Sequence, residues 1–450
     1  MSWNKVISPQ SSQFLHRLMA TLGSTLLVWL ICIPAAHAVP SFARQTGEEC
    51  AACHIGALGP QLTPHGMMFK LGGFTDNDGK PGHIPLAAML VGSYAHTSKD
   101  LDPTDSSSND LKRIQEASIF LAGRLSDHLG AFVQATNSST DHRFSMDNVD
   151  IRFAHPVQTG DSQTLLGVTL NNNPTVSDPL NSVPAWRFPF MSPEMVETVS
   201  PLIDGVLGQQ VGGLSAYAYW NSSVYAELGG YRSLSKGFLD DVNVEAGGKL
   251  SKTAPYWRLA WIKDLRKQAW SAGLFGMNAD LRPDGSSSGP SDKFRDIGVD
   301  GTYQYLGTRK HIYTVNAAYI HERQTRDASF AAGEAANLSG DLNRIDLNGS
   351  YYYDQTYGVT AAYFRVKGDS DATLYADSAA GSPDTTGWIL QADWTPFGKE
   401  NSWGAPWANV RLGLQYTWYT RFLGTKNNYD GAGRNASDNN TAYAFIWLAF

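Results

Sequence analysis

Residues 410–420 read VRLGLQYTWYT, and this stretch decides the fold class. Its side chains alternate between two faces of an extended chain: Val410, Leu412, Leu414, Tyr416 and Trp418 on one, and Arg411, Gly413, Gln415, Thr417 and Tyr419 on the other. In the same way, Trp388, Leu390, Ala392 and Trp394 face away from Gln391 and Asp393. One apolar face and one polar face are typical of a membrane barrel, which has lipid outside and a polar lumen inside.

The composition of the chain agrees with a β-rich membrane protein. Of its 450 residues, 17% are charged, 12% are aromatic and 43 are glycine. No stretch after the N-terminus is apolar for long enough to form a membrane-spanning helix. A soluble β-sandwich would share much of this composition, so only the alternating strands distinguish the membrane barrel from it. The formal net charge is −7 and there is no basic run, which argues against nucleic acid as a partner.

Alternating segments recur from Pro85 onward, separated by clusters of Gly, Ser, Asn and Asp. The candidate strands are odd in number, whereas a bacterial barrel with both ends in the periplasm needs an even number. The weakest candidate is 243–250, which is Gly-rich and lies within a long loop. Without it, we predict an all-β, up-and-down antiparallel transmembrane barrel of about 16 strands, its apolar face in contact with outer-membrane lipid.

Long polar loops are expected to alternate with short turns along this barrel. The long loops are 277–293, 322–341, 368–384 and 421–437, and the short turns lie near Gly307, Asp354 and Asp264-Leu265. Segment 99–112, which contains Asp100, Asp102, Asp105 and Asp110, is expected to be an extracellular loop. The last strand, Ala442–Phe450, closes on an aromatic residue and resembles the assembly signal of bacterial outer-membrane proteins.

The first 38 residues have the features of a secretory signal peptide. Lys5, His16 and Arg17 precede or begin an apolar stretch from Leu18 to Ile33, and Ala36-His37-Ala38 supplies a small-x-small cleavage site. A retained membrane anchor is the alternative. Cleavage before Val39 would remove Cys32 and leave two cysteines. We therefore predict a signal peptide at 1–38, a short N-terminal segment at 39–84 and the barrel at 85–450.

Those two cysteines lie in the motif Cys50-Ala51-Ala52-Cys53-His54. C-x-x-C-H is the attachment pattern of c-type haem: two thiols bond the two vinyl groups, and the adjoining His54 becomes the proximal ligand of the haem iron. A redox dithiol needs no adjoining histidine, and a structural zinc site would need a fourth ligand. The motif therefore predicts one covalent haem c, attached in the periplasm.

The second axial ligand of that iron is open from sequence. Thr63-Pro64 predicts a helix from Pro64 to about Leu71, with Thr63 as N-cap. This helix would carry the leading candidates, His65, Met67 and Met68, while His83 and His96 are further possibilities. Alternatively, the methionines simply pack against the porphyrin or a neighbouring wall. Segment 173–212, rich in Pro and aromatic residues, is expected to fold into the lumen or to cover the haem.

The N-terminal segment also resembles a known family. Residues 38–46 read A-x-P-x-F-A-R-Q-T, C-x-x-C-H follows, and Pro60-Gln61-Leu62 reads P-x-L. Over residues 38–74 this is similar to the fused monohaem cytochrome–porins, the outer-membrane iron oxidases of iron-oxidising bacteria. The barrel matches in general pattern. The resemblance implies a haem segment in or under a porin of about 16 strands, which passes electrons from extracellular Fe(II) to a periplasmic c-type cytochrome.

Three functions are consistent with these features. The first is electron transfer from extracellular Fe(II) or another donor, with outward flow to an extracellular acceptor as a variant. The second is a porin or channel in the bacterial outer membrane whose haem segment is a plug or sensor. The third is a haem enzyme such as a peroxidase, which ranks last because the short segment lacks an Arg-His distal pair. Whether the electron-transfer protein is to be classed as an enzyme is open.

Overall fold

The computed structural model describes residues 40–100, 109–139, 142–160, 162–196, 198–399 and 402–450. The predicted signal peptide and most of the acidic segment 99–112 lie outside these residues. All the described residues belong to one compact unit. No helix within them is long and apolar enough to span a membrane.

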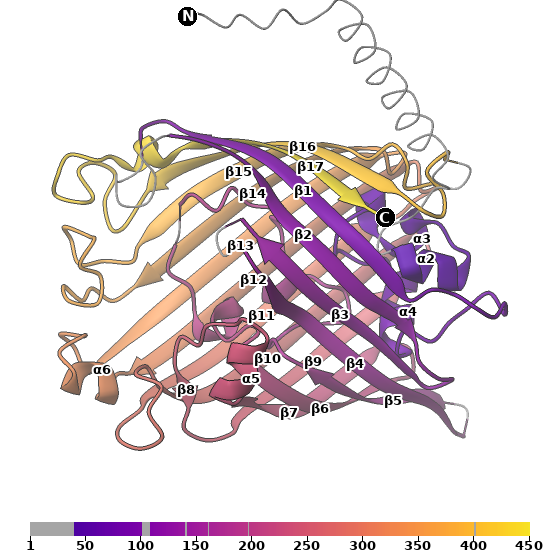
Figure 1. Ribbon diagram of the computed structural model, residues 1–450, viewed down its shortest axis with the longest axis horizontal. Coiled ribbons are helices and arrows are strands. Elements are labelled where there is room, and N and C mark those ends of the chain that lie inside the picture. Colours follow the sequence, from indigo (N-terminus) through magenta and orange to yellow (C-terminus); the bar gives the residue numbers. More distant parts are fainter. Residues whose placement is uncertain (1–39, 101–108, 140–141, 161, 197, 400–401) are drawn as a thin grey trace, which may run out of the picture. The chain divides into compact units, whose positions relative to one another are not determined.

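Antiparallel strands form a closed barrel (Figure 1). The sheet has 17 strands, and 16 of them build the wall, because β8 (Lys249–Leu250) has only 2 residues and lies in a loop beside β10. The barrel closes where β1 pairs with both β2 and β17. The wall strands are β1 (Leu86–Thr97), β2 (Asp110–Arg124), β3 (Leu129–Ser138), β4 (Phe144–Thr159), β5 (Ser162–Asn171), β6 (Val211–Trp220), β7 (Val224–Ser233), β9 (Ala254–Asp264), β10 (Gln268–Arg282), β11 (Asp292–Tyr305), β12 (His311–Thr325), β13 (Ser339–Tyr353), β14 (Tyr357–Gly368), β15 (Thr385–Trp394), β16 (Asn409–Arg421) and β17 (Thr441–Ala449).

The strand count and the loop assignment of 243–250 confirm the sequence prediction. Several strands run further than expected, however, and their loops are correspondingly shorter. β10 continues through Met277–Arg282, where the sequence predicted loop, because those residues pair along their length with the start of β11. Likewise β2 begins at Asp110 rather than after residue 112. Polar hairpin ends remain paired because backbone hydrogen bonds extend a ladder regardless of side-chain polarity.

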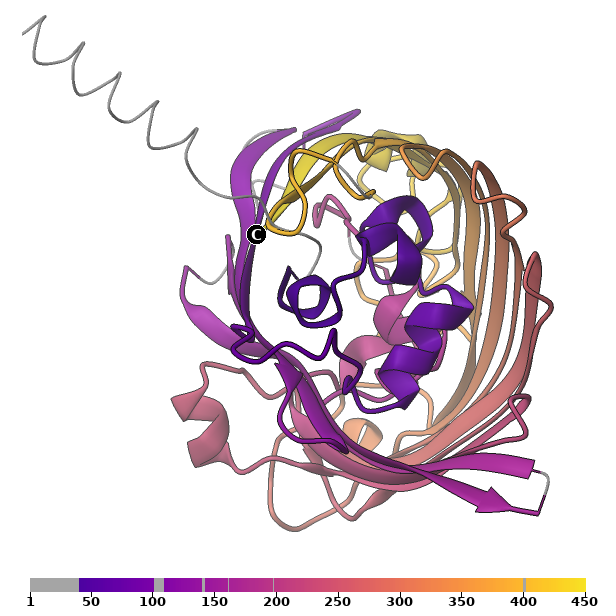
Figure 2. The same cartoon turned by 90° about the vertical axis from the view of Figure 1, so that its right-hand side faces the viewer.

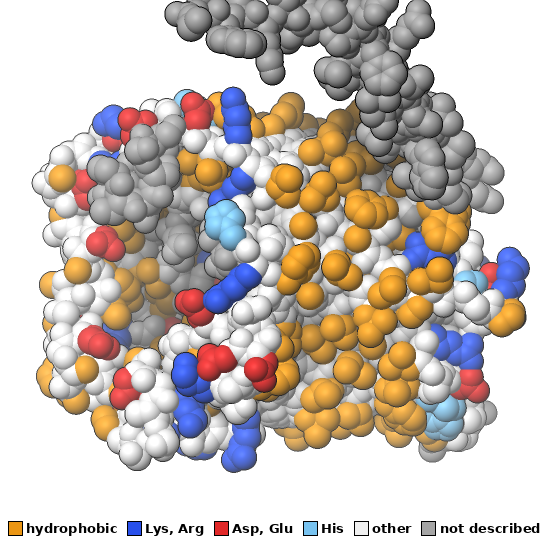
Figure 3. Space-filling model, viewed as in Figure 1, with side chains coloured by type: hydrophobic (Ala, Val, Ile, Leu, Met, Phe, Trp, Pro, Cys, Tyr) orange, Lys and Arg blue, Asp and Glu red, His pale blue; other side chains and the backbone are white. Residues whose placement is uncertain are grey.

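Side chains alternate between lipid and lumen as the sequence predicted. In β16, Leu414 and Tyr416 are exposed on the outer face. Arg411, Gln415 and Thr417, on the other face of the strand, are buried in the interior. Most wall strands carry exposed Leu, Ile, Val, Trp or Tyr side chains, and on the face shown in Figure 3 apolar side chains cover a broad area. In a closed barrel every strand is hydrogen-bonded along both edges, so no edge has unpaired backbone groups inside the hydrocarbon layer. The protein is therefore a porin-like β-barrel of the bacterial outer membrane.

The two ends of the barrel differ in their connections. One end has mostly short turns, such as 221–223 and 354–356, although 395–408 is longer. The other end has the long loops, among them 172–210, 369–384 and 422–440, and carries α5 (Lys236–Asp241) and α6 (Asp327–Ala331). In outer-membrane barrels the short turns face the periplasm. The first described segment and the C-terminal end of β17 both lie at the short-turn side of the barrel (Figure 1).

Two segments occupy the lumen. The N-terminal segment folds into α2 (Pro40–Thr46), α3 (Cys50–Cys53), a 3₁₀ turn η1 (Ile55–Ala57) and α4 (Pro64–Leu71), which lie inside the barrel mouth at the short-turn end (Figure 2). The loop 172–210, with the short turns η2 (Pro184–Trp186) and η3 (Leu202–Val206), folds inward from the opposite end. This loop therefore enters the lumen, as predicted. Another short turn, η4 (Ala436–Asn439), precedes β17.

Candidate functional site

The C-x-x-C-H residues form a short helix followed by a tight return of the chain. Cys50–Cys53 is one helical turn, and the amide of His54 donates to the carbonyl of Cys50 at 2.8 Å. The chain then doubles back, and the amide of Thr63 donates to the carbonyl of Cys53 at 2.9 Å. A Cβ on Gly66 would lie 2.3 Å from the carbonyl oxygen of Cys53. Only glycine allows α4 to approach the cysteine turn this closely.

Helix α4 begins and ends as the sequence predicted. Its N-cap Thr63 accepts a hydrogen bond from the amide of Gly66 at 3.2 Å, and Pro64 occupies the first turn. The Thr63 hydroxyl also donates to the carbonyl of Ala52 at 2.6 Å. One side chain therefore both caps α4 and ties it to α3.

One turn and the start of β16, both at the short-turn end, hold the peptide that follows His54. The side chain of Gln355 accepts from the amide of Gly56 at 2.6 Å, and that of Asn409 donates to the carbonyl of Ala57 at 2.7 Å. Arg411, 1% exposed, donates to the carbonyl of Leu58 at 2.6 Å while it pairs with Asp393 at 2.8 Å. The inward-facing polar residues of the last strands thus fix the peptide that carries His54.

Cys50, Cys53 and His54 line one cavity of about 420 Å³. The barrel wall also lines this cavity and contributes Met89, Phe120, Phe132 and Trp447 from four strands. The lumenal loop adds Trp186, Phe190 and Met191. Ligand sites typically have this size and this mainly apolar lining. No disulfide joins Cys50 to Cys53.

Burial favours the neutral forms of Cys53 and His54. Burial raises the pKa of Cys53 to about 12, with nearby Glu48 adding to the shift and Arg309 opposing it. Burial lowers the pKa of His54 to about 4, and the main chain of Gly59 opposes this shift in part. A neutral imidazole is the form that binds a metal.

Two buried polar atoms at the cavity lack a hydrogen-bond partner within the described residues, and they are His54 Nδ1 and Trp447 Nε1. Buried donors are nearly always satisfied in folded proteins. Trp447 is only 8% exposed. An unpartnered indole N–H at a cavity of this size points to a bound group with an acceptor.

None of the second-ligand candidates on α4 lines this cavity. His65 is exposed, and its Nε2 lies 2.5 Å from Glu48. Met67 is buried in a separate cluster with Leu180 and Tyr217, and Met68 is 42% exposed. The more distant candidates are also engaged elsewhere: His83 contacts Asp78 at 2.7 Å, and His96 contacts Asp110 at 3.1 Å.

His65 belongs instead to a small group at the barrel mouth. Ligand atoms of Glu48, Cys53 and His65 lie within 4.8 Å of one another. They line a second cavity of about 380 Å³ together with Asp127 of the β2–β3 turn. Cys53 therefore lines both this cavity and the larger one.

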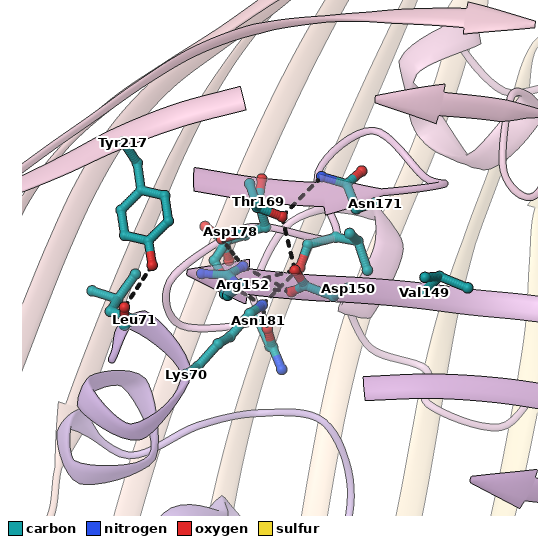
Figure 4. Close-up of polar contacts among 12 residues, drawn as sticks. Lys70, Leu71, Val149, Asp150, Arg152, Thr169, Asn171, Asp178, Asn181 and Tyr217 are labelled. Atoms are coloured by element: carbon teal, nitrogen blue, oxygen red, sulfur yellow. Dashed lines mark hydrogen bonds and ion pairs between the residues drawn. The ribbon is translucent and has the colours of Figure 1, made fainter. Parts of the chain in front are cut away.

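A buried lysine joins the N-terminal segment to the lumenal loop (Figure 4). The ammonium group of Lys70 donates to the carbonyls of Val176 and Asp178, each at 2.7 Å, and to Oδ1 of Asn181 at 2.5 Å. The amide of Asn181 in turn donates to the carbonyl of Pro60 at 2.8 Å. Burial lowers the pKa of Lys70 to about 7, Arg152 adds to the shift, and Asp150, Asp178 and Glu227 oppose it.

No local pattern in the sequence pointed to the wall residues of this cavity. Met89, Trp447 and Lys70 are distant from one another in sequence, and strand pairing brings the first two together: Met89 faces Ala449 and Val91 faces Trp447. Only the loop had a signal, since its cluster of Pro and aromatic residues at 184–190 suggested a packed segment.

No protein-family model matches the chain, and no curated protein matches it by sequence. Similar solved structures include an anion-selective porin from Comamonas acidovorans, with 12% identity, a TM-score of 0.45, and coverage of 81% of this chain and 98% of the porin. OmpF of Salmonella typhi, in complex with daunomycin, has 12% identity, a TM-score of 0.46, and coverage of 81% and 97%. The outer-membrane protein OmpT of Vibrio cholerae has 13% identity, a TM-score of 0.41, and coverage of 81% and 96%.

Proposed function

We propose that this barrel carries one covalent haem c on Cys50 and Cys53, with His54 as the proximal iron ligand, and that it transfers electrons across the outer membrane. The observation that carries the proposal is the placement of all three motif side chains on one cavity of about 420 Å³. When bound, the haem supplies one-electron redox chemistry.

The donor set of the site fits this cofactor. Two thiols and an imidazole in a C-x-x-C-H turn are the attachment groups of a c-type haem. The His54 imidazole is neutral at physiological pH, as an iron ligand must be. Phe120, Phe132 and Phe190 give the cavity aromatic walls, which would exclude water from the macrocycle. The unpartnered indole N–H of Trp447 is available to an acceptor on the cofactor.

The position of the site suggests where electrons leave. The motif lies at the short-turn end, which faces the periplasm in outer-membrane barrels. Cys53 also lines the second cavity at that mouth, beside the exposed His65 and Glu48. A periplasmic c-type cytochrome that docks at this end would approach the cofactor edge directly.

We further propose extracellular Fe(II) as the donor. The support is the resemblance of residues 38–74 to the cytochrome–porin iron oxidases, together with the poor solubility of ferric products at neutral pH, which favours oxidation outside the cell. The test is rapid-mixing absorbance of the oxidised protein with Fe(II), without oxygen. Reduced haem bands should appear at a rate that rises with the Fe(II) concentration.

Two other outcomes of that experiment would assign the protein differently. Reduction by dithionite but not by Fe(II) would exclude iron as the donor. Reduction by a reduced periplasmic cytochrome, again without reduction by Fe(II), would indicate outward electron flow. An absence of covalent haem in the purified protein would remove the electron-transfer proposal altogether.

A channel is the second candidate, and the porin-like barrel itself favours it. In this case the N-terminal segment would be a plug or sensor in a solute pathway. The lumen contains both that segment and the loop 172–210, so a solute would have to pass around them (Figure 2). Planar-bilayer recording distinguishes the candidates, because steady ion conductance without any reaction with Fe(II) would support the channel.

A further inference from the structure

Three side chains of metal-binding type meet at the periplasmic mouth of the barrel. They are Glu48 from the segment after α2, Cys53 at the end of α3, and His65 from the first turn of α4. Their ligand atoms, one carboxylate oxygen, the sulfur and one imidazole nitrogen, lie within 4.8 Å of one another. Metal–ligand bonds of about 2.0–2.3 Å place the ligands of a tetrahedral zinc ion roughly 3.3–3.8 Å apart. The three side chains therefore need only a small closure to surround an ion.

The backbone that carries these side chains is fixed by local contacts. The amide of Thr63 donates to the carbonyl of Cys53 at 2.9 Å, and a Cβ on Gly66 would lie 2.3 Å from that carbonyl oxygen. The first turn of α4 therefore lies directly against Cys53. The hydroxyl oxygen of Thr46 accepts from the amide of Glu48 at 3.3 Å. Ligands on fixed elements hold the geometry that a metal ion requires.

His65 and Glu48 already contact each other. Nε2 of His65 lies 2.5 Å from Oε2 of Glu48, and the two side chains are 47% and 40% exposed, so an ion reaches them from solvent. A metal ion can replace the proton between these two atoms and take both as ligands. With the partly exposed Cys53 as a third ligand, one position remains for water, as in zinc sites with three protein ligands.

The surroundings of the three side chains favour a cation. The mouth cavity of about 380 Å³ is lined in addition by Asp76, Asp127 and Arg124. Arg124 is paired with Asp127, which leaves the cavity without an excess of positive charge. Carboxylates that line a cleft raise the local concentration of cations.

We propose that Glu48, Cys53 and His65 bind a thiophilic divalent cation of the Zn(II) class in the haem-free chain. Thiolate and imidazole are characteristic protein ligands of Zn(II), and a carboxylate oxygen completes the set. The ion bonds the thiolate sulfur, and the thiol proton leaves to solvent.

This site shares one residue with the proposed haem attachment. Once the sulfur of Cys53 is bonded to a haem vinyl carbon it is a thioether, and the thiolate ligand is lost. Metal binding and haem attachment therefore exclude each other at Cys53. The exclusion rests on the proposed attachment of haem to Cys50 and Cys53, whereas the metal site itself does not.

The test uses the full chain, refolded without haem under reducing conditions and titrated with Co(II). Co(II) occupies zinc sites and shows an intense near-ultraviolet band when a thiolate binds it. The unmodified chain should show this band and lose it when Zn(II) displaces Co(II), and Cys53→Ser should lack it. Cys50→Ser is the matched control and should retain the band, because Cys50 lines the larger cavity and not the mouth cavity.

Variants of the other two ligands test the rest of the site. His65→Ala and Glu48→Gln should each weaken Co(II) binding by roughly tenfold or more. His83→Ala should bind Co(II) as the unmodified chain does, because His83 contacts Asp78 outside the group.

Each outcome decides the assignment. Absence of the band in the unmodified chain, retention in Cys53→Ser, loss in Cys50→Ser, or unchanged affinity in both His65→Ala and Glu48→Gln overturns the site. Titration of the haem-loaded protein tests the exclusion, which a thiolate band in that protein would overturn. Failure of the chain to take up covalent haem would refute the haem proposal and the exclusion, while the metal site would stand on the titration of the haem-free chain.

Discussion

Cys53 shows how much a single side chain in this protein depends on its surroundings. It lines the larger cavity beside Cys50 and His54, and also the mouth cavity beside Glu48 and His65. Burial raises the pKa of its thiol to about 12. The thiol is therefore a poor nucleophile at neutral pH, since the thiolate is the reactive form. The C-x-x-C-H pattern is visible in the sequence, whereas the place of Cys53 in both cavities is not.

Replacing both Cys50 and Cys53 with Ala should remove covalent haem, because no thiol would then remain to bond it. Haem staining of the denatured protein should fall to background. Met68→Leu is the control: Met68 is 42% exposed and does not line the cavity, so staining should be unchanged. Full-strength staining of the double cysteine variant would contradict the attachment site.

At the scale of elements, buried polar contacts hold the N-terminal segment against the lumenal loop. The apolar contacts of α4 with the lumenal loop and the wall are those of Met67 and Leu71, which pack with Leu180 and Tyr217. Directional hydrogen bonds from Lys70 and Tyr217 supply the specificity, the latter to the carbonyl of Leu71 at 2.6 Å (Figure 4). Sequence predicted α4 from its cap but not these contacts, because they join positions more than 100 residues apart.

Lys70→Met should loosen the docking of α4 on the loop 172–210. Hydrogen bonds to charged groups contribute about 1.5–3 kcal/mol each, and the variant removes this donor from the carbonyl of Asp178 and from Oδ1 of Asn181. The carbonyl of Val176 also loses Lys70 but keeps the indole N–H of Trp186 at 2.9 Å. Amide hydrogen exchange of α4 should therefore accelerate by roughly tenfold or more. Lys80→Met, at a side chain that is 79% exposed, should leave the exchange rate unchanged. Equal exchange in both variants would contradict the clamp.

Asp371 ties two extracellular loops together. Its carboxylate accepts from the amides of Ala336 and Asn337 in one loop and from those of Thr373 and Leu374 in its own, at 2.9–3.1 Å. Although burial opposes ionisation, these backbone hydrogen bonds together lower the pKa of Asp371 to about 2. The carboxylate is stabilising when ionised.

The sign of the pH dependence follows from that shift. Because the folded pKa is below the ordinary value of 3.8, the stabilisation is complete above 3.8 and is lost as the pH falls to about 2. Cleavage of loops 326–338 and 369–384 by pepsin should increase over this range. Asp371→Ala should show fast cleavage already at pH 4, whereas Asp377→Ala, at an exposed position, should resemble the unmodified protein. Cleavage of the unmodified protein that stays constant from pH 4 to pH 2 would refute the tie.

At the scale of the whole molecule, the barrel separates an apolar exterior from a charged interior. Arg152, Arg258 and Arg411 are each no more than 2% exposed, and each pairs with an aspartate inside the barrel. On the face shown in Figure 3, by contrast, the exterior of the wall carries a broad apolar area. Lipid outside and a packed polar lumen inside are therefore both properties of the closed sheet, since alternate residues of every strand face opposite ways.

Leu228→Arg should destabilise the folded barrel in lipid by about 2–4 kcal/mol, the cost of an arginine near the bilayer midplane. Leu228 lies near the middle of β7 and is 68% exposed. Reversible unfolding in vesicles, titrated with guanidinium, measures this free energy. Leu265→Arg places the same residue in a short turn and should change stability little. Similar free energies for the two variants would place Leu228 outside the lipid belt.

The sequence alone determined the local features of this protein: the two-residue alternation of the strands, the cap of α4 and the C-x-x-C-H turn. Each depends on neighbours within a few residues, where backbone geometry and side-chain chemistry suffice. Only the tertiary structure decided which wall side chains line the cavity of His54, because barrel closure sets the register that brings Met89 and Trp447 to it. The inward path of the loop and the burial of Lys70 depend likewise on packing between distant segments, which no local pattern encodes.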